Sequence, residues 1–164
     1  MQQLKNFFLI GLFTLFLAAC GDKADDLKAD VNNLRQTLDT ALKQENGTNL
    51  IQQLESAQSN EDKVKAYNNI ISSFQTVIKA VNDLKMNTDE AKAVQAKYNE
   101  GLTLFVDLMK KSSDLTSHQP SPEEVKAYTE LQSKTTQTLD NAEKSLAELQ
   151  KQVDDATQKA AETK

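Results

Sequence analysis

Few residues of this 164-residue chain have side chains suited to chemistry. The sequence holds one histidine, His118, one cysteine, Cys20, and no tryptophan. His118 lies in a stretch that contains Ser, Gln and Pro. No Cys, Asp or Glu that could act together with it lies immediately beside it except Asp114. A metal site needs several converging ligands, and a nucleophile needs a base within reach. We therefore expect His118 to be a solvated loop residue, and we expect no catalytic residue and no metal site.

Cofactor chemistry has equally few candidates. Helical bundles can hold haem through Met and His, and here the ligands would be Met86, Met109 and His118. No Cys-x-x-Cys-His motif is present for covalent attachment, and we expect Met109 to fill the core. Carboxylate-bridged metal sites in bundles need a Glu-x-x-His motif, which is also absent. The sequence therefore predicts that the protein binds no cofactor and is not an enzyme.

Three tyrosines share one position within their helices. Tyr67, Tyr98 and Tyr128 each fall in the first or second turn of an apolar stripe. Tyrosine buries its ring and keeps its hydroxyl near water or a partner. Two interpretations stay open: the three rings pack together at one end of a bundle, or they line a pocket for a small apolar ligand between helices.

The position of Cys20 is informative because an apolar run ends there. Lys5 precedes an uncharged run of about a dozen residues, from Phe7 to Ala18. A membrane span needs about 20 residues, so this run suits the hydrophobic region of a secretory signal better. An unpaired cysteine cannot form an internal disulfide, so it needs another explanation.

The residues Leu17-Ala18-Ala19-Cys20 resemble the lipobox of bacterial lipoprotein signal peptides. The resemblance implies that residues 1–19 are removed, that Cys20 carries a diacyl group, and that the new amino terminus is acylated with palmitate-like chains. Two or more acyl chains give stable membrane anchoring. The mature protein is thus expected to be tied to a membrane without spanning it.

The residue after the cysteine bears on which membrane this is. In enteric bacteria, aspartate directly after the lipidated cysteine resembles an inner-membrane retention signal, but here that position is Gly21. The resemblance therefore implies the outer membrane, with the protein facing the periplasm. The outer leaflet of the inner membrane and the cell surface remain alternatives.

Composition restricts both fold and partners. The formal net charge is −5, and it becomes −6 when residues 1–19 and their single lysine are removed. This acidic balance argues against nucleic acid as a partner. Gly and Pro are scarce, and Gln, Asn, Ser, Thr, Lys and Glu dominate. This composition favours helices over a sheet or a disulfide scaffold.

Helical periodicity divides the remaining chain into segments. The first runs from about Ala24 to Glu45, and a short amphipathic turn with Leu50, Ile51 and Leu54 facing inward follows it. Later helices start near residues 60, 89 and 122, the last from the capping box Ser121-Pro122-Glu123-Glu124. That helix should run to about Lys159 and pack less tightly midway, where Gln132 and Thr135 interrupt its stripe.

These observations predict an all-α, elongated antiparallel bundle of three to four long amphipathic helices, with coiled-coil-like packing. We expect a signal peptide over residues 1–19, a lipidated tether over 20–23, one helical domain over 24–160 and a frayed tail over 161–164. The expected partners are the membrane, through the acyl chains, and another envelope protein. The predicted function is a non-enzymatic interaction or scaffold module of the cell envelope. The alternative is a carrier or sensor of a small apolar ligand bound near Tyr67, Tyr98 and Tyr128.

Overall fold

A computed structural model describes residues 21–44 and 47–162, and within them the chain forms five helices. Cys20 and the predicted lipobox lie outside the described residues. The helices are α2 (Gly21–Gln44), α3 (Gly47–Ser56), α4 (Asn60–Asp83), α5 (Asp89–Leu115) and α6 (Pro122–Glu162). Four of these helices are long and α3 is short. The described residues form helices and no strands, so the predicted all-α fold is confirmed.

Helices α4, α5 and α6 each begin directly after a residue whose side chain caps the first turn. Ser59 Oγ accepts a hydrogen bond from the backbone N–H of Asp62 at 3.0 Å, and Thr88 Oγ1 accepts one from Ala91 at 3.4 Å. At α6, Ser121 Oγ accepts from the Glu124 N–H at 3.2 Å, while the Glu124 carboxylate accepts from the Ser121 N–H at 2.9 Å. Each cap satisfies N–H groups that have no partner within their own helix. The predicted capping box is therefore present in full.

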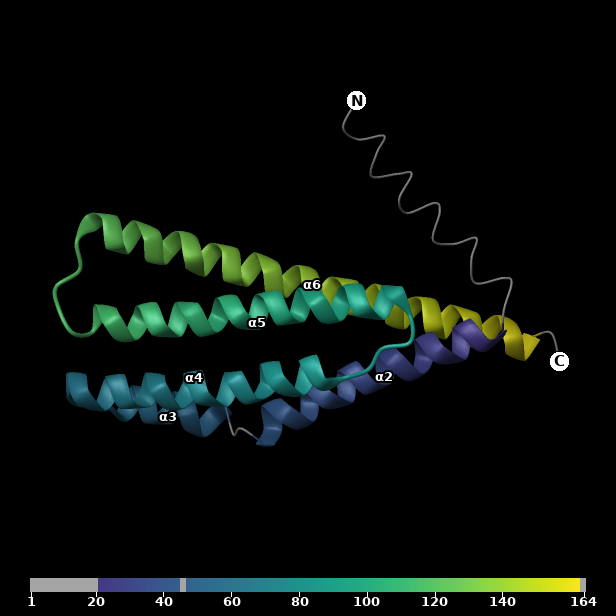
Figure 1. Cartoon of the computed structure of the whole chain (residues 1–164), viewed down its shortest axis with the longest axis horizontal. Helices are drawn as coiled ribbons and strands as arrows, with labels where there is room; N and C mark the ends of the chain where they lie inside the picture. The colour runs from purple at the N-terminus through teal and green to yellow at the C-terminus, as the bar shows by residue number, and fades with distance from the viewer. Residues whose placement is uncertain (1–20, 45–46, 163–164) are drawn as a thin grey trace, which may run out of the picture.

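The helices pack as an elongated antiparallel bundle around α5, which lies along α6 on one side and α4 on the other (Figure 1). Helix α2 contacts α4, α5 and α6, whereas α3 packs mainly on α4. The start of α2 and the end of α6 lie at one end of the bundle. The turns between α3 and α4 and between α5 and α6 lie at the other end.

Helices α5 and α6 lie close together at Gly101. A Cβ atom placed on Gly101 would lie 2.6 Å from Leu139 Cδ2, so a larger residue would force that leucine to move. One turn earlier on α6, Thr135 is 3% exposed and its hydroxyl donates to the Leu131 carbonyl at 2.8 Å. Thr135 is therefore well packed, contrary to expectation, because the missing side chain of Gly101 lets the helices approach and the hydroxyl finds a partner within its own helix. Gln132, the other residue that interrupts the stripe, is exposed.

Two other expectations about helix faces and ends need correction. Ile51 is 58% exposed, although we expected it to face inward with Leu50, which is 9% exposed. Consecutive helical residues point about 100° apart, and a helix that packs mainly on one neighbour buries only a narrow stripe. In addition, α2 already includes residues 21–23, expected as a tether, and α6 extends to Glu162, beyond the expected end at Lys159.

Candidate functional site

The main buried core lies in one half of the bundle, where α2 covers the other helices. We call this part the closed half: α2, residues 74–83 of α4, 89–103 of α5 and 139–162 of α6. The main cluster of buried apolar side chains consists of Leu27, Val31, Leu34, Leu38, Ala41, Val77, Val81, Met86, Ala91, Val94, Leu102, Leu146, Leu149 and Val153. All of these residues belong to the closed half or to the α4–α5 turn, so the α2 stripe predicted from sequence is confirmed as core.

The remaining part, which we call the open half, has less cover. It comprises α3, residues 60–73 of α4, 104–115 of α5 and 122–138 of α6. No buried residue from it belongs to the main core cluster. Many of its large apolar side chains are only half-buried, namely Tyr67, Ile71, Leu104, Phe105, Met109, Tyr128 and Leu131. Val125 is 49% exposed.

Aromatic rings mark the boundary between the two halves. Phe74 of α4 and Phe105 of α5 pack with their ring centroids 4.3 Å apart and their planes tilted by 40°. Both rings remain half-buried. Aromatic side chains and methionine are enriched in protein–protein interfaces. The open half, built from parts of four helices, therefore carries residue types that are common in such interfaces.

Charge on the open half is nearly balanced. Residues 47–73 and 104–138 contain eight acidic and six basic side chains. Several of these pair locally, such as Lys110 with Asp107 at 3.0 Å. Such exposed pairs contribute little and produce no strong field. Recognition by this half would therefore rest on apolar contact more than on charge.

The three tyrosines do not form one cluster. Tyr67 and Tyr128 both lie near Ser112, whose buried hydroxyl donates to the Leu108 carbonyl at 2.9 Å and lies 3.4 Å from the Tyr128 hydroxyl. Tyr98 lies 14 residues before Ser112 on α5, which corresponds to about 21 Å. It faces Arg35 of α2 and Glu143 of α6 instead. The expected common cluster is therefore wrong, because α4 and α6 both run antiparallel to α5 and place their first turns beside its end.

The pKa values of the tyrosines reflect these different positions. Burial raises the pKa of Tyr98 to about 12; the Glu143 carboxylate adds to the shift and Arg35 opposes it. Burial also raises the pKa of Tyr67, with a further contribution from Tyr128 and an opposing one from the hydrogen bond to Ser112. Both phenols favour the neutral form because their ionised form would be poorly solvated.

The candidate metal and haem ligands lie apart. Met86 is 8% exposed and belongs to the closed core. Met109 lies 20 residues after the start of α5, about 30 Å along the helix, so Met86 and Met109 do not meet. His118 is exposed, and its Nε2 lies 3.1 Å from Glu124 Oε1. In the residues that the structure describes, no group of three or more His, Cys, Asp or Glu side chains could hold a metal ion.

Sequence reasoning missed Asp30, a buried carboxylate. Asp30 is fully buried and accepts hydrogen bonds from the backbone N–H groups of Asn87 and Thr88, from the Asn87 amide and from the Thr88 hydroxyl, at 2.8–3.1 Å. These bonds tie α2 to the turn between α4 and α5. The signal was present in the sequence: Asp30 follows Leu27 by three residues and precedes Leu34 by four, so an acid stands within the apolar stripe.

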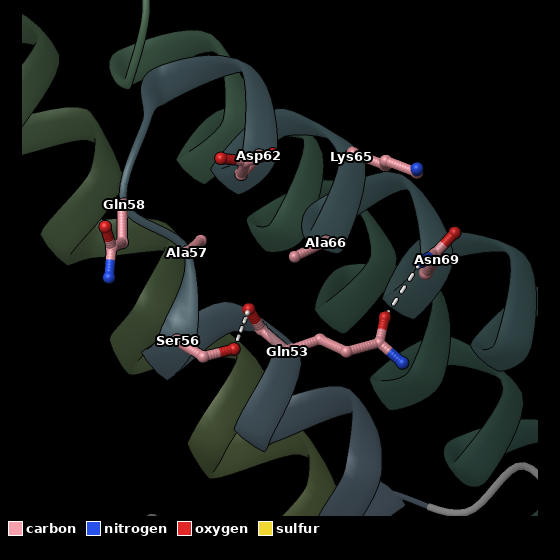
Figure 2. Close-up of a pocket in the computed structure, with 8 residues that line it drawn as sticks. All are labelled: Gln53, Ser56, Ala57, Gln58, Asp62, Lys65, Ala66 and Asn69. Atoms are coloured by element: carbon pink, nitrogen blue, oxygen red, sulfur yellow. Dashed lines mark hydrogen bonds between the residues drawn. The ribbon is translucent and has the colours of Figure 1, made fainter.

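A surface hollow lies where α3 meets α4. Its volume is about 420 Å³, and it is lined by Gln53, Ser56, Ala57, Gln58, Asp62, Lys65, Ala66 and Asn69. Figure 2 shows Ala57 and Ala66 on opposite sides of this hollow, with Lys65 pointing away from it. A second hollow of about 270 Å³ lies between α2 and α4, lined by Gln36, Thr37, Thr40, Ala41 and Ala80. Neither hollow is lined by a tyrosine.

Comparison with known proteins gives a family match. A family model described as uncharacterised lipoprotein PM1805 matches residues 28–161. No curated protein matches the chain. No solved structure matches it either. Among the described helices, none is long and apolar enough to cross a membrane.

Proposed function

The chain belongs to the uncharacterised lipoprotein PM1805 family, and from that premise we propose that it is a lipid-anchored, non-enzymatic interaction module of the bacterial cell envelope. The lipid is attached to Cys20 after removal of residues 1–19. The anchored protein lies at the outer membrane and faces the periplasm. Its partner is another envelope protein, which binds the open half of the bundle.

One observation carries this proposal: α4, α5 and α6 run through both halves, but α2 covers them in only one. In the closed half, Val77 and Val81 are completely buried. In the open half, Ala66, Ile70, Val106 and Leu108 are also buried. Phe105, Met109 and Leu131 are only partly buried there, and Val125 is exposed. Burying such apolar area contributes about 25 cal/mol per Å², so a partner that covers it gains binding energy.

The position of the anchor supports the same role. Helix α2 starts at Gly21, one residue after Cys20, at the end of the bundle that also holds the end of α6 (Figure 1). The open half is at the opposite end. Helix α6 has 41 residues, which span about 60 Å at 1.5 Å per residue. An anchored bundle standing on its closed end would thus present the open half far from the lipid surface.

Site-specific photo-crosslinking in intact cells tests the proposal. A photoreactive residue replaces Val125, which is 49% exposed in the open half, and a matched control replaces Leu42, which is 44% exposed on α2. We expect a discrete envelope protein to crosslink at position 125 and not at position 42. The same crosslink should weaken in Cys20→Ser, which removes the anchor.

Two outcomes would contradict the proposal. Equal crosslinking at both positions would indicate general proximity instead of a binding surface. An absence of crosslinks at position 125, with the protein abundant and membrane-bound, would indicate that the open half has no protein partner.

A further inference from the structure

Helices α2 and α3 cover successive parts of the same face of α4. Ala66, Ile70, Val77 and Val81 are all buried and lie on one line of that helix. Val77 and Val81 belong to the main core beneath α2. Ala66 lines the hollow beneath α3 and lies outside the main core cluster. Helix α2 therefore covers the later part of this face of α4, and α3 covers the earlier part.

Several features of the contact between α3 and α4 indicate that it is easily broken. Helix α3 has ten residues, fewer than the 12–15 at which an isolated helix becomes even marginally stable. Among the described side chains of α3, Leu50 is the one buried apolar residue at 9% exposure, while Leu54 is half-buried and Ile51 is exposed. The hydrogen bond from Asn69 Nδ2 to Gln53 Oε1, 3.0 Å long, joins two exposed side chains (Figure 2). The hollow of about 420 Å³ lies at the same contact.

From these observations we infer that α3 is a displaceable cover, and that an amphipathic helix of the partner takes its place on residues 62–70 of α4. This inference rests on the proposed function and specifies part of its binding surface. The occupant's chemistry can be read from α3 itself, which is the segment that fits this face. It carries two leucines four residues apart, Leu50 and Leu54, with an amide at Gln53 that bonds Asn69.

The chain can release α3 without disturbing the rest of the bundle. Residues 57–59 connect α3 to α4, and residues 45–46 separate it from α2. Release would make residues 47–59 part of the connection between α2 and α4, and loop-closure entropy grows only slowly with length. The main core holds no residue of α3. Displacement would therefore cost local contacts such as those of Leu50, Leu54 and Gln53, and would leave the main core in place.

A peptide-binding experiment on the full mature chain in detergent micelles tests this inference. The probe is a fluorescein-labelled peptide with the sequence of residues 47–59, and the control peptide has serine in place of both leucines. The host variants are Leu50→Asp, which releases the chain's own α3, and Gln53→Cys with Asn69→Cys bridged by a bismaleimide, which holds it down. Fluorescence anisotropy measures binding.

We expect the probe to bind the Leu50→Asp host at least tenfold more tightly than the unmodified chain, and not to bind the bridged host. The control peptide should bind none of them. Equal binding to the bridged and released hosts would overturn the inference, as would no binding to a Leu50→Asp host that keeps its helical circular dichroism.

Hydrogen exchange on the unmodified chain provides a second readout that does not depend on any variant. We expect the amides of α3 to exchange at least a hundredfold faster than those of residues 77–81 in α4. Equal protection in the two segments would contradict a displaceable α3.

Crosslinking in cells separates failure of this inference from failure of the proposed function. A photoreactive residue at Asn69, which lines the hollow and bonds Gln53 of α3, should capture the same partner as one at Val125. A partner captured at position 125 but not at 69 would leave the proposed function intact and overturn the role of α3.

Discussion

The closed and open halves are built from the same three helices but differ in what covers them. Along α5, Val94 and Leu102 belong to the main core, while Phe105 and Met109 further along the helix are half-buried. The apolar stripe of α5 continues through both positions. Val106 and Leu108 are also buried, so part of the stripe is covered without belonging to the core beneath α2. An amphipathic stripe thus predicts that a face needs cover, and the chain supplies a long covering helix for only one half.

The largest expected difference between the halves concerns core truncation. Leu34→Ala removes a completely buried side chain from the closed half and should lower the free energy of unfolding by about 3 kcal/mol. Leu131→Ala removes a half-buried side chain from the open half and should cost about 1 kcal/mol. Urea denaturation followed by circular dichroism measures both values. Equal losses would remove the energetic distinction between the halves.

The buried carboxylate of the closed half should show the next largest effect. Asp30→Asn replaces one acceptor oxygen with an N–H donor that faces the donors of Asn87 and Thr88. Leaving buried donors unsatisfied should lower the free energy of unfolding by about 2 kcal/mol. Asp39→Asn, an exposed change on the same helix, should alter it by less than about 0.5 kcal/mol. If the two variants were equally stable, the Asp30 contacts would not matter for stability.

The start of α6 provides a smaller and more local test in the open half. Ser121→Ala removes the side-chain cap that accepts the Glu124 N–H, and it should cost about 1 kcal/mol. Because the open half lacks the main core, we expect the loss to appear as faster hydrogen exchange near residues 123–128. Exchange at residues 146–153 should stay unchanged. A uniform increase over both regions would show that the halves unfold as one unit.

Alkaline pH tests the closed half through Tyr98, and Tyr67, whose pKa is also raised by burial, adds a contribution from the open half. The pKa of Tyr98 is about 12 in the folded protein against 10 for an ordinary tyrosine, so ionisation favours the unfolded state. The stability contributed by keeping Tyr98 neutral is fully present below pH 10 and is lost as pH rises from 10 towards 12. Tyr98→Phe should therefore lose less stability than the unmodified chain over this range. Parallel loss in the two proteins would exclude Tyr98 as a source of the pH dependence.

Much of the local structure follows from the sequence because it is decided by neighbours along the chain. The capping box at Ser121 and the restart at Thr88 depend on residues three apart, and both are present. The α2 stripe was predicted for the same reason, since helical spacing alone identifies Leu27, Val31 and Leu34 as one face.

The arrangement of helices did not follow in the same way, because an apolar stripe does not specify its partner. Tyr67, Tyr98 and Tyr128 occupy similar places in their own helices, yet antiparallel packing brings only two of them to Ser112. The open half was also not predicted, since the expected end of the first helix near Glu45 does not say which part of α4 that helix covers. Asp30 was missed because helical spacing identifies the apolar members of a stripe and not the distant donors that an acid within it would meet.

The contacts of Asp30 bear on the register of α2, that is, on how far this helix is shifted along its neighbours. The apolar residues of α2 are similar enough that a slip of one turn, about 5.4 Å, would exchange one leucine or valine for another at little cost. A single buried polar group can fix such a register, as it does in coiled coils. Only one position of α2 sets the Asp30 carboxylate against Asn87 and Thr88. In the proposed anchored form, Asp30 lies ten residues from the lipidated cysteine, so it fixes the height at which the whole bundle stands above the membrane.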